Sequence, residues 1–425
     1  MTLTLLRRRL AMVVLMALSA LNANALQAAI PASERAVLLN LYATTNGDSW
    51  TRRDNWNGPV GTECTWFGIQ CDQDGNAVTA ISLAGNKLSG SLPSDLNKLA
   101  NLRNLHVQSN ELTGAIPELA GLVNLITLDV QENRLTGQIP TLTGLSKLTW
   151  FRAWSNHLSG SIPSLAGLDS LAFFAVGNNR LAGPIPSLAG MTNLRTFEAE
   201  INQLTGPIPS LDGLTLYVFA VGYNRLSGSI PSFDRVVALA DFAANDNELT
   251  GTIPSLVGVA SLNSIDVRNN QLTGLIPSLH GLQIRRLLLD NNQLTGSIPS
   301  FDGLTNLGHS WAENNRLSGP IPPLTGLTRL QGFRVAGNNL TGAVPPVPNP
   351  NALVASGSTL CPNSLDHTPS PAWDTATGVR PWYTNCAVSP LPPVAVIPTL
   401  SEWTLGALAL LLLATGVGAA RGRAR

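Results

Sequence analysis

The sequence predicts a solenoid, a single elongated domain in which short coils of chain stack on one another. A motif of the form Leu-x-Gly-x-Ile-Pro, with small variations, occurs twelve times, and its proline recurs every 22–24 residues from Pro93 to Pro345. An asparagine stands four residues before the glycine of each motif, from Asn86 to Asn338. Self-similarity at a fixed period of this length is typical of stacked repeats, in which one domain grows by adding coils.

One repeat shows why each position is needed. Leu128 and Val130 are two residues apart, so both side chains point to the same side of a short strand and enter the core, while the residues beside them face outward. Asn133 ends the strand, and its amide can bond backbone groups that a strand ladder leaves unpaired. Gly137 relieves backbone crowding, and Pro140 stops strand pairing. One repeat cannot bury its own apolar stripe, so we expect stability to come from stacking.

The two inward positions of the strands show a second regularity, in which a phenylalanine precedes an alanine. A large side chain beside a small one conserves core volume. These pairs are Phe151 and Ala153, Phe197 and Ala199, and Phe242 and Ala244. The repeat with Ser310 and Ala312 has two small residues instead, and a slip of one residue would turn Trp311 inward, so this repeat has the least certain register.

Residues 125–135 match the pattern L-x-x-L-x-L-x-x-N-x-L of leucine-rich repeats. With the Leu-x-Gly-x-Ile-Pro half, residues 33–345 resemble the plant-type subfamily of leucine-rich-repeat proteins, which includes plant receptor ectodomains and polygalacturonase inhibitors. This resemblance implies a curved, right-handed leucine-rich-repeat solenoid of about twelve repeats at residues 78–345. A parallel β-sheet would line its concave face, with a cap at each end.

The two ends of such a stack expose apolar surface, and residues 26–77 and 346–387 are the predicted caps. Residues 33–42 have the pattern of an amphipathic helix capped by Ser33. The pattern Cys-x-Trp-x-Gly-x-x-Cys at residues 64–71 is similar to the N-terminal cap of plant-type leucine-rich-repeat proteins. We expect this cap to be plugged by its large apolar side chains, which are Trp50, Trp56 and Trp66.

The four cysteines form two pairs outside the repeats, Cys64 with Cys71 and Cys361 with Cys386. An even number at the two ends of an exported chain favours two local disulfides. Four free thiols in a reducing compartment are the alternative.

The N-terminus favours export. Residues 1–25 have the three parts of a signal peptide: arginines at 7–9, an apolar stretch at 10–21, and Ala23-Asn24-Ala25 as a cleavage site.

The C-terminus predicts a sorting signal after a proline-rich linker at residues 388–396. Residues 405–420 are apolar and would span roughly 24 Å as a helix, and arginines follow them. Residues 397–425 resemble the IPTL-CTERM sorting signal of Gram-negative bacteria, which implies processing by an exosortase-type enzyme. A permanent single-pass membrane anchor is the alternative. The motif residues are Ile397, Pro398, Thr399, Leu400, Glu402 and Trp403.

The composition argues against several classes of function. Only 12% of residues are charged, and 26 basic residues balance 26 acidic ones, so there is no broad electrostatic reason to bind nucleic acid. The five histidines lack metal-ligand spacing, and no Gly-x-Ser-x-Gly or phosphate-binding motif occurs. We therefore expect neither a metal nor a cofactor, and we expect that the chain is not an enzyme.

The outward residues of the strands form two candidate binding patches on the concave face. Aromatic and arginine side chains on a rigid exposed sheet favour ligand binding, and aromatic faces also suit sugar rings. The first patch contains Trp150, Arg152, Trp154 and Phe173, followed by Glu198 and Glu200. The second contains Asp266, Arg268, Arg286, Asp290, His309, Trp311 and Glu313. Between the patches, alanines and glycines leave a nearly bare floor, formed by Ala175, Gly177, Ala220, Gly222 and Ala243.

Three functional hypotheses follow from this surface. The first is a cell-surface recognition or adhesion module that binds a protein or a glycan. The second is a structural component of the envelope or biofilm matrix, in which the solenoid is only a spacer. The third, inhibition of a secreted enzyme, rests on the resemblance to the plant inhibitors alone.

Overall fold

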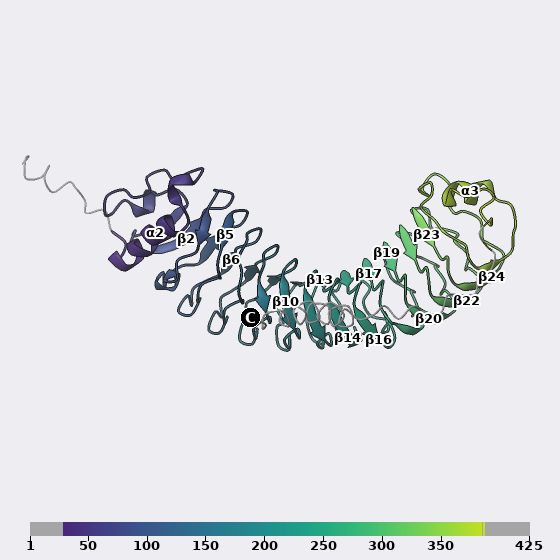
Figure 1. The fold of residues 1–425 in the computed structure, drawn as a ribbon. Helices are drawn as coiled ribbons and strands as arrows, with labels where there is room; N and C mark the ends of the chain where they lie inside the picture. Colours follow the sequence, from purple (N-terminus) through teal and green to yellow (C-terminus); the bar gives the residue numbers. More distant parts are fainter. Residues whose placement is uncertain (1–28, 385, 387–425) are drawn as a thin grey trace, which may run out of the picture. The chain divides into compact units, whose positions relative to one another are not determined.

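The computed structural model describes residues 29–384 and residue 386. These residues form a curved stack of coils, and each coil contributes one short strand to the inner side of the arc (Figure 1). The predicted leucine-rich-repeat solenoid is therefore confirmed. None of the helices in this part of the chain is long and apolar enough to cross a membrane. The predicted signal peptide at residues 1–25, the linker at residues 388–396 and the sorting signal at residues 397–425 lie outside the described residues. The predicted C-terminal cap at residues 346–387 is described except for residues 385 and 387.

The concave sheet has thirteen strands, of which β1 pairs antiparallel with β2 and all later neighbours pair in parallel. In spatial order these strands are β1 (Ile69–Cys71), β2 (Val78–Ser82), β4 (Asn104–His106), β6 (Thr127–Asp129), β7 (Trp150–Arg152), β9 (Phe173–Ala175), β11 (Thr196–Glu198), β13 (Val218–Ala220), β15 (Asp241–Ala243), β17 (Ser264–Asp266), β19 (Arg286–Leu288), β21 (His309–Trp311) and β23 (Gly332–Arg334).

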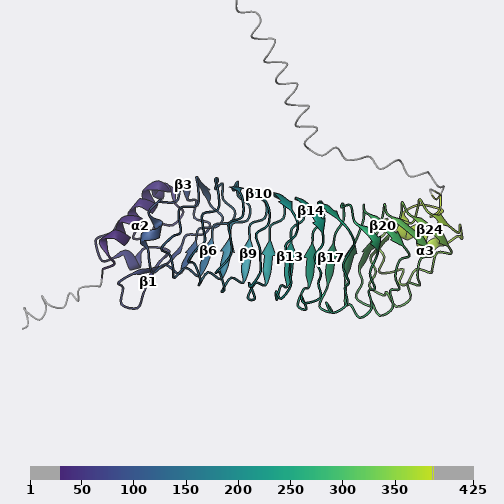
Figure 2. The ribbon, with the colours of Figure 1, turned by 90° about the horizontal axis from the view of Figure 1, so that it is seen from below.

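The Leu-x-Gly half of most motifs forms a short strand, and these parallel strands make a second row that runs beside the first (Figure 2). At Leu135–Gly137 the row has only an isolated bridge, between Ala115 and Thr136. One five-stranded sheet contains β8 (Ser159–Gly160), β10 (Arg180–Gly183), β12 (Gln203–Gly206), β14 (Arg225–Ser229) and β16 (Glu248–Thr250). Another contains β18 (Thr273–Leu275), β20 (Gln293–Gly296), β22 (Arg316–Gly319), β24 (Asn339–Gly342) and β25 (Ser364–Leu365). A two-stranded sheet contains β3 (Ser89–Ser91) and β5 (Glu111–Thr113).

The recurring asparagines form a hydrogen-bonded ladder inside the stack. The amide of Asn156 donates to the carbonyl oxygens of Val130, Ala153 and Trp154 at 3.0–3.3 Å, and its oxygen accepts from the backbone N–H of Leu135 at 2.9 Å. From Asn110 onward, each ladder asparagine bonds its own coil and the coil before it, while Asn86 bonds the backbone of Arg52 in the N-terminal cap. Because buried backbone groups need partners, the asparagine replaces the hydrogen bonds that the turn cannot make.

The residue before each ladder asparagine has a left-handed backbone, which reverses the chain at one rim of the concave sheet. Most repeats place glycine or a small or polar residue there, for which this conformation costs least. Ile201 and Tyr223 are exceptions, with φ values of 54° and 55°. Both side chains are about half exposed, so the core gains little from them.

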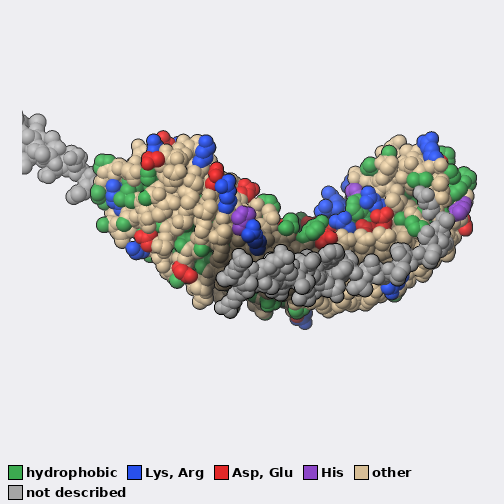
Figure 3. Space-filling model, in the orientation of Figure 1, with side chains coloured by type: hydrophobic (Ala, Val, Ile, Leu, Met, Phe, Trp, Pro, Cys, Tyr) green, Lys and Arg blue, Asp and Glu red, His purple; other side chains and the backbone are tan. Residues whose placement is uncertain are grey.

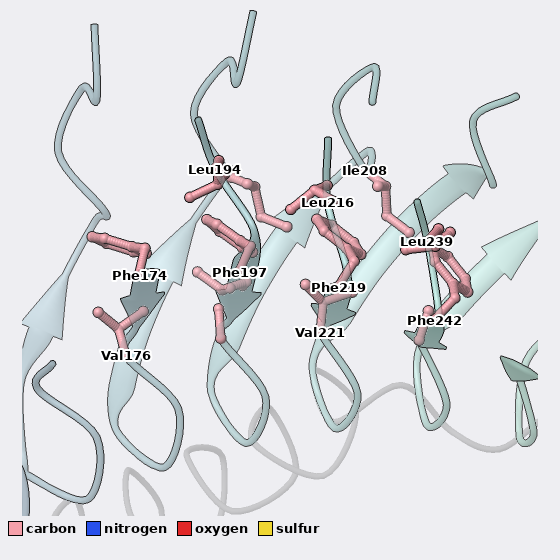
Figure 4. Packing of buried hydrophobic residues seen from close by; sticks show 14 of the residues in the cluster. Phe174, Val176, Leu194, Phe197, Ile208, Leu216, Phe219, Val221, Leu239 and Phe242 are labelled. Atoms are coloured by element: carbon pink, nitrogen blue, oxygen red, sulfur yellow. The ribbon is translucent and has the colours of Figure 1, made fainter. Parts of the chain in front are cut away.

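Phenylalanines stack along the middle of the core (Figure 4). The strands pair without a shift in register, so equivalent side chains lie beside one another in successive coils. Adjacent ring centroids are 5.2–5.8 Å apart, and the rings are nearly parallel. The stack consists of Phe151, Phe174, Phe197, Phe219 and Phe242, so it includes the alanine-paired phenylalanines.

The repeat with two small inward residues keeps the register of its neighbours. Ser310 and Ala312 are buried, and Trp311 is on the outward side. Phe333 is the strand neighbour of Ser310 in the next coil, and it packs edge-on against the buried Phe301, which lies in the loop before β21.

The N-terminal cap is a helix and a tryptophan cluster. Helix α2 (Ala32–Thr44) begins one residue before Ser33, and no side chain caps it, so the predicted Ser33 cap is wrong. The Glu34 side chain is buried instead, and its carboxylate accepts a hydrogen bond from the backbone N–H of Val78 at 2.7 Å, which links the helix to β2.

The predicted plug of tryptophans is present in this cap. Trp50, Trp56 and Trp66 are buried, with successive ring centroids 4.9 and 5.0 Å apart. Two single-turn helices lie in the same cap, η1 (Gly47–Ser49) and η2 (Glu63–Thr65), and η3 (Leu96–Lys98) lies in the first coil. The stacked indoles cover the apolar end that the first coil would otherwise expose.

The C-terminal cap continues the ladder before it closes the stack. Asn363 accepts from the backbone N–H of Leu340 at 2.9 Å, as the asparagines of the repeats do. Helix α3 (Pro371–Thr377) then places Trp373 against the end of the core, with its indole N–H donating to the carbonyl of Pro345 at 2.9 Å. The two predicted disulfides, Cys64–Cys71 and Cys361–Cys386, are both formed, and each lies in a cap.

We predict that Asn156→Ala destabilises the fold by about 3–5 kcal/mol, because it leaves several buried backbone groups without partners. Urea unfolding followed by circular dichroism measures this loss. Asn193→Ala is the matched control: Asn193 is exposed and makes one hydrogen bond, to the carbonyl of Asp169. Equal losses in the two variants would contradict a structural role for the ladder.

Candidate functional site

The outward residues of the concave strands form three rows that run along the arc. In the first row Trp150 lies beside Phe173, and in the second Arg152 lies beside Ala175, as the strand pairing requires. The third row contains the outward residue two positions further on, such as Trp154. Because every coil repeats the same register, neighbours in a row are separated by one repeat in sequence and by about 4.8 Å in space.

The first patch is an aromatic pair with an arginine held over it. The rings of Trp150 and Phe173 stack with centroids 5.1 Å apart. The Arg152 guanidinium lies 4.6 Å from the centroid of Trp150 and 4.9 Å from that of Phe173. Asp129 accepts from Arg152 Nη1 at 3.4 Å and is itself buried. The structure therefore brings Trp150, Arg152 and Phe173 together and adds Asp129, which the sequence prediction did not include.

The Trp154 indole occupies the space that a side chain of its third-row neighbour, Gly177, would fill. A Cβ atom on Gly177 would stand 2.7 Å from Trp154 Cδ1 and 3.0 Å from the Glu200 carboxyl carbon. The indole of Trp154, from the preceding coil, and the carboxylate of Glu200, from the next coil, therefore both lie close to Gly177. Trp154 is half-buried, so the two predicted tryptophans are neither free in solvent nor inside the core.

Glu198 and Glu200 border the first patch. Burial raises the pKa of both carboxyl groups, and the charge of Glu200 raises that of Glu198 further, while Arg152 lowers it. One carboxylate oxygen of Glu200 is buried, and within the described residues it has no hydrogen-bond partner.

The second patch is built around Trp311. The guanidinium of Arg268 lies 5.4 Å from its ring centroid and that of Arg334 lies 4.3 Å away, while His309 meets the ring edge-on at 5.6 Å. Asp266 holds Arg268 through two hydrogen bonds of 2.9 and 2.7 Å. Burial, and the charges of Arg286 and Arg334, lower the pKa of His309. Figure 3 shows charged side chains gathered where this end of the arc faces the concavity.

Asp290 and Glu313 depart from the expected solvent-exposed surface. Asp290 is only 6% exposed and accepts from the backbone N–H of Glu313 at 2.8 Å. Glu313 accepts from the hydroxyl of Thr359, which lies in the C-terminal cap. The prediction that Asp290 is exposed is therefore wrong: the third row is partly covered there by the coils that follow.

Two residues that belong to the patches were missed, Asp129 and Arg334. Both could have been found by arithmetic, because each lies 23 residues from a predicted neighbour, Arg152 and Trp311 respectively, and is paired with it in register. Inspection of single strands hides such pairs, since contacts in a solenoid run between coils.

Asp290 makes stability depend on pH. Burial raises its pKa from 3.8 to about 6. The folded state therefore binds more protons than the unfolded chain between about pH 4 and 6, and the free energy of unfolding falls as pH rises through that interval.

We predict that Asp290→Asn keeps the acceptor for Glu313, removes this pH dependence and raises stability at pH 7 by on the order of 2 kcal/mol. Urea unfolding at pH 4 and pH 7 measures the effect. Asp302→Asn, at an exposed position, is the control and is expected to change neither value. A parent-like pH slope in the Asp290 variant would refute the assignment.

Comparison with known proteins agrees with the fold. The Leucine Rich Repeat family model matches residues 261–282. The receptor-like kinase TMK2 of Arabidopsis thaliana is 48% identical over 69 residues, which is 16% of this chain and 7% of the relative. The chain thus spans only a small part of the length of the curated relatives that it matches.

Solved structures match over a much longer stretch. The plant peptide hormone receptor RGFR1 in complex with RGF2 is 32% identical, with a TM-score of 0.60 over 67% of this chain and 47% of that one. A plant ice-binding protein is 25% identical, with a TM-score of 0.55 over 65% of this chain and 92% of that one. The chain is therefore a leucine-rich-repeat β-solenoid similar to plant-type leucine-rich-repeat ectodomains.

Proposed function

We propose that this protein is an exported recognition module that binds a protein or glycan ligand on its concave face. The observation that carries the proposal is the aromatic and arginine patch of Trp150, Arg152 and Phe173. Two aromatic rings and a guanidinium are stacked on a rigid sheet and remain partly open to solvent. Side chains of these types dominate the energetics of binding interfaces.

The patch is organised before any ligand arrives. Asp129 holds Arg152, and the strand register fixes Trp150 against Phe173. A ligand that binds here would not have to order these side chains, which is a main cost of association. Packing that only stabilised the stack would not need to keep these rings partly exposed, since the core is already filled by the phenylalanines behind them.

The comparisons support ligand binding by analogy. The structural relative RGFR1 is a peptide hormone receptor in complex with RGF2. The ice-binding relative has the same fold, so the fold alone does not decide between functions. The main support for this chain is therefore the preorganised patch of Trp150, Arg152 and Phe173, and the shared fold is secondary support.

Export is part of the proposal. Two disulfides, one in each cap, favour an oxidising compartment outside the cytoplasm. The signal peptide at residues 1–25 and the IPTL-CTERM tail at residues 397–425, with its exosortase-type enzyme, complete the proposed route to the cell envelope. We also propose that the chain acts by binding and not by catalysis, with neither metal nor cofactor.

We predict that the double variant Trp150→Ala and Trp154→Ala loses at least roughly tenfold in ligand affinity, because it removes the two largest contact surfaces of the patch. The measurement is binding of the purified full-length chain to glycan and peptide arrays. The control is Leu275→Ala. Leu275 is 63% exposed and lies in β18, which is not a strand of the concave sheet. Unchanged binding or surface attachment in the tryptophan variant would favour a structural spacer.

We further predict that Gly177→Ala weakens the same binding by several-fold without removing an aromatic group. The new methyl group would occupy the space of the Trp154 indole and displace it. Fluorescence of the tryptophans reports the displacement, and the arrays report the binding. A displaced indole with parent-like affinity would show that Trp154 takes no part.

A further inference from the structure

The middle of the concave face is a hollow between the aromatic centres of the two patches, and Asp266 and Arg286 of the second patch line it. It has a volume of about 290 Å³ and is floored by small residues of β13 and β15, Ala220 and Ala243. Gly222 extends the floor, because the Asn245 side chain leans over the position where a Cβ atom would stand, at 2.5 Å. The lining residues come from four neighbouring strands, β13 to β19, so the hollow is about 14 Å long along the arc. On its β11 side, Glu198 pairs in register with the lining residue Ala220.

Carboxylates border this hollow in excess of cations. Glu198 and Glu200 stand on the side of β11, Asp241 stands at the start of β15, and Asp266 stands on β17. Asp266 is neutralised by Arg268, but within the described residues the other three carboxylates make no ion pair. Arg286 also lines the hollow. Arg152, whose charge acts on Glu198, is paired with Asp129. The four carboxylates therefore exceed Arg268 and Arg286 by two negative charges around an uncharged floor.

The same carboxylates are already partly withdrawn from water. Burial raises the pKa of Glu198 and of Glu200, and their mutual repulsion raises that of Glu198 further. A cation placed between them would relieve both costs, because an opposite charge favours the ionised form.

Exposed apolar side chains lie at both ends of strands that form or flank the hollow. Tyr217 precedes β13 and is 56% exposed, while Ile201 and Tyr223 follow their strands and are 47% and 55% exposed. Ile201 and Tyr223 also occupy the left-handed turn position, where neighbouring repeats use asparagine, aspartate or serine. Asparagine there would cost less backbone energy and would expose no apolar surface, so neither folding nor solubility accounts for these side chains.

We propose that the hollow is the docking groove for an extended, basic segment of a partner protein. One lysine or arginine of the segment lies over the alanine and glycine floor between Glu198, Glu200 and Asp241. Its apolar neighbours pack against Ile201 and Tyr223 at one end of these strands and Tyr217 at the other. This inference rests on the proposed function, since it names the class of ligand that the concave face binds.

The charge and the exposed apolar side chains together favour a peptide over a glycan. A neutral glycan offers hydroxyl groups, which leave the excess negative charge uncompensated. An extended peptide presents alternate side chains to one surface and can supply a cation and apolar groups at the required spacing. Charge complementarity of this kind sets partner choice and association rate.

The experiment selects a phage-displayed library of random 12-residue peptides on the purified full-length chain. We expect the recovered peptides to be enriched in lysine or arginine flanked by apolar residues. One recovered peptide is then synthesised with its basic residues and with glutamine in their place. The basic form is expected to bind at least about tenfold more tightly, with an advantage that shrinks at high salt.

Two variants test the groove itself. Glu198→Gln with Glu200→Gln is expected to lose about tenfold in affinity for the basic peptide, whereas Glu118→Gln with Asp302→Asn, which removes the same charge at exposed positions outside the concave strands, is expected to keep it. Ile201→Asn with Tyr223→Asn suits the left-handed turn, so it is expected to fold normally and to weaken binding several-fold.

Four results would overturn the inference. They are recovered peptides without basic enrichment, equal affinity of the two synthetic forms, parent-like affinity of the glutamate variant, and capture of a chitosan oligomer through Glu198 and Glu200 when no peptide is recovered. The proposed function fails separately. If binding is lost with the Trp150 and Trp154 variant but kept with the glutamate variant, the proposed function is supported and the proposed groove for a basic segment is refuted. If the chain binds no peptide and no glycan, both fall.

Discussion

The asparagine ladder is the interaction on which the rest of the structure depends. Each side-chain amide bonds carbonyl groups of its own coil and of the preceding one, and its oxygen accepts a backbone N–H of the preceding coil, as at Asn156. A coil of about 23 residues has too few strand hydrogen bonds to satisfy its turns. Because a buried unpaired backbone group costs roughly 1–3 kcal/mol, the side chain that pairs it also fixes where the next coil must lie. The pattern continues to Asn363, so the C-terminal cap is held by the same interaction as the repeats.

Because the coils stack in a fixed register, residues at equivalent positions of successive repeats form a continuous surface. Residues one repeat apart become neighbours, and groups that are remote in the chain meet on the concave face: Asp129 with Arg152, and Trp311 with Arg334. The phenylalanine stack behind β7 to β15 makes this part of the surface rigid, since a close-packed core has low compressibility. The aromatic patch and the acidic hollow are therefore parts of one preorganised face, where the ligand's own conformational freedom is the main entropy still to be lost.

Several features of this face cost stability and are not explained by folding. Asp290 and Glu200 hold carboxylates away from water, and Ile201 places a β-branched side chain in a left-handed turn. Polar burial and backbone strain of this kind gather where proteins bind or react. In this chain they lie in the same stretch of coils as the bare floor of Ala220 and Gly222. The acidic centre and the charge-balanced end around Trp311 give the face a direction along the arc, which an extended ligand could follow.

The sequence by itself determined the architecture, because twelve copies of one motif allow only one way to bury the leucines and pair the asparagines. It also determined which residues face outward, and Trp150, Arg152 and Phe173 were found from alternation alone. The tertiary structure decided how these residues combine. The burial of Asp290, the failure of Ser33 to cap its helix, the place of Trp154 over Gly177 and the pairing of Asp129 with Arg152 all depend on contacts between coils. Alternation within a strand reports the side of the sheet, whereas depth and partners depend on the strands before and after it. Only the stacked solenoid contains that information.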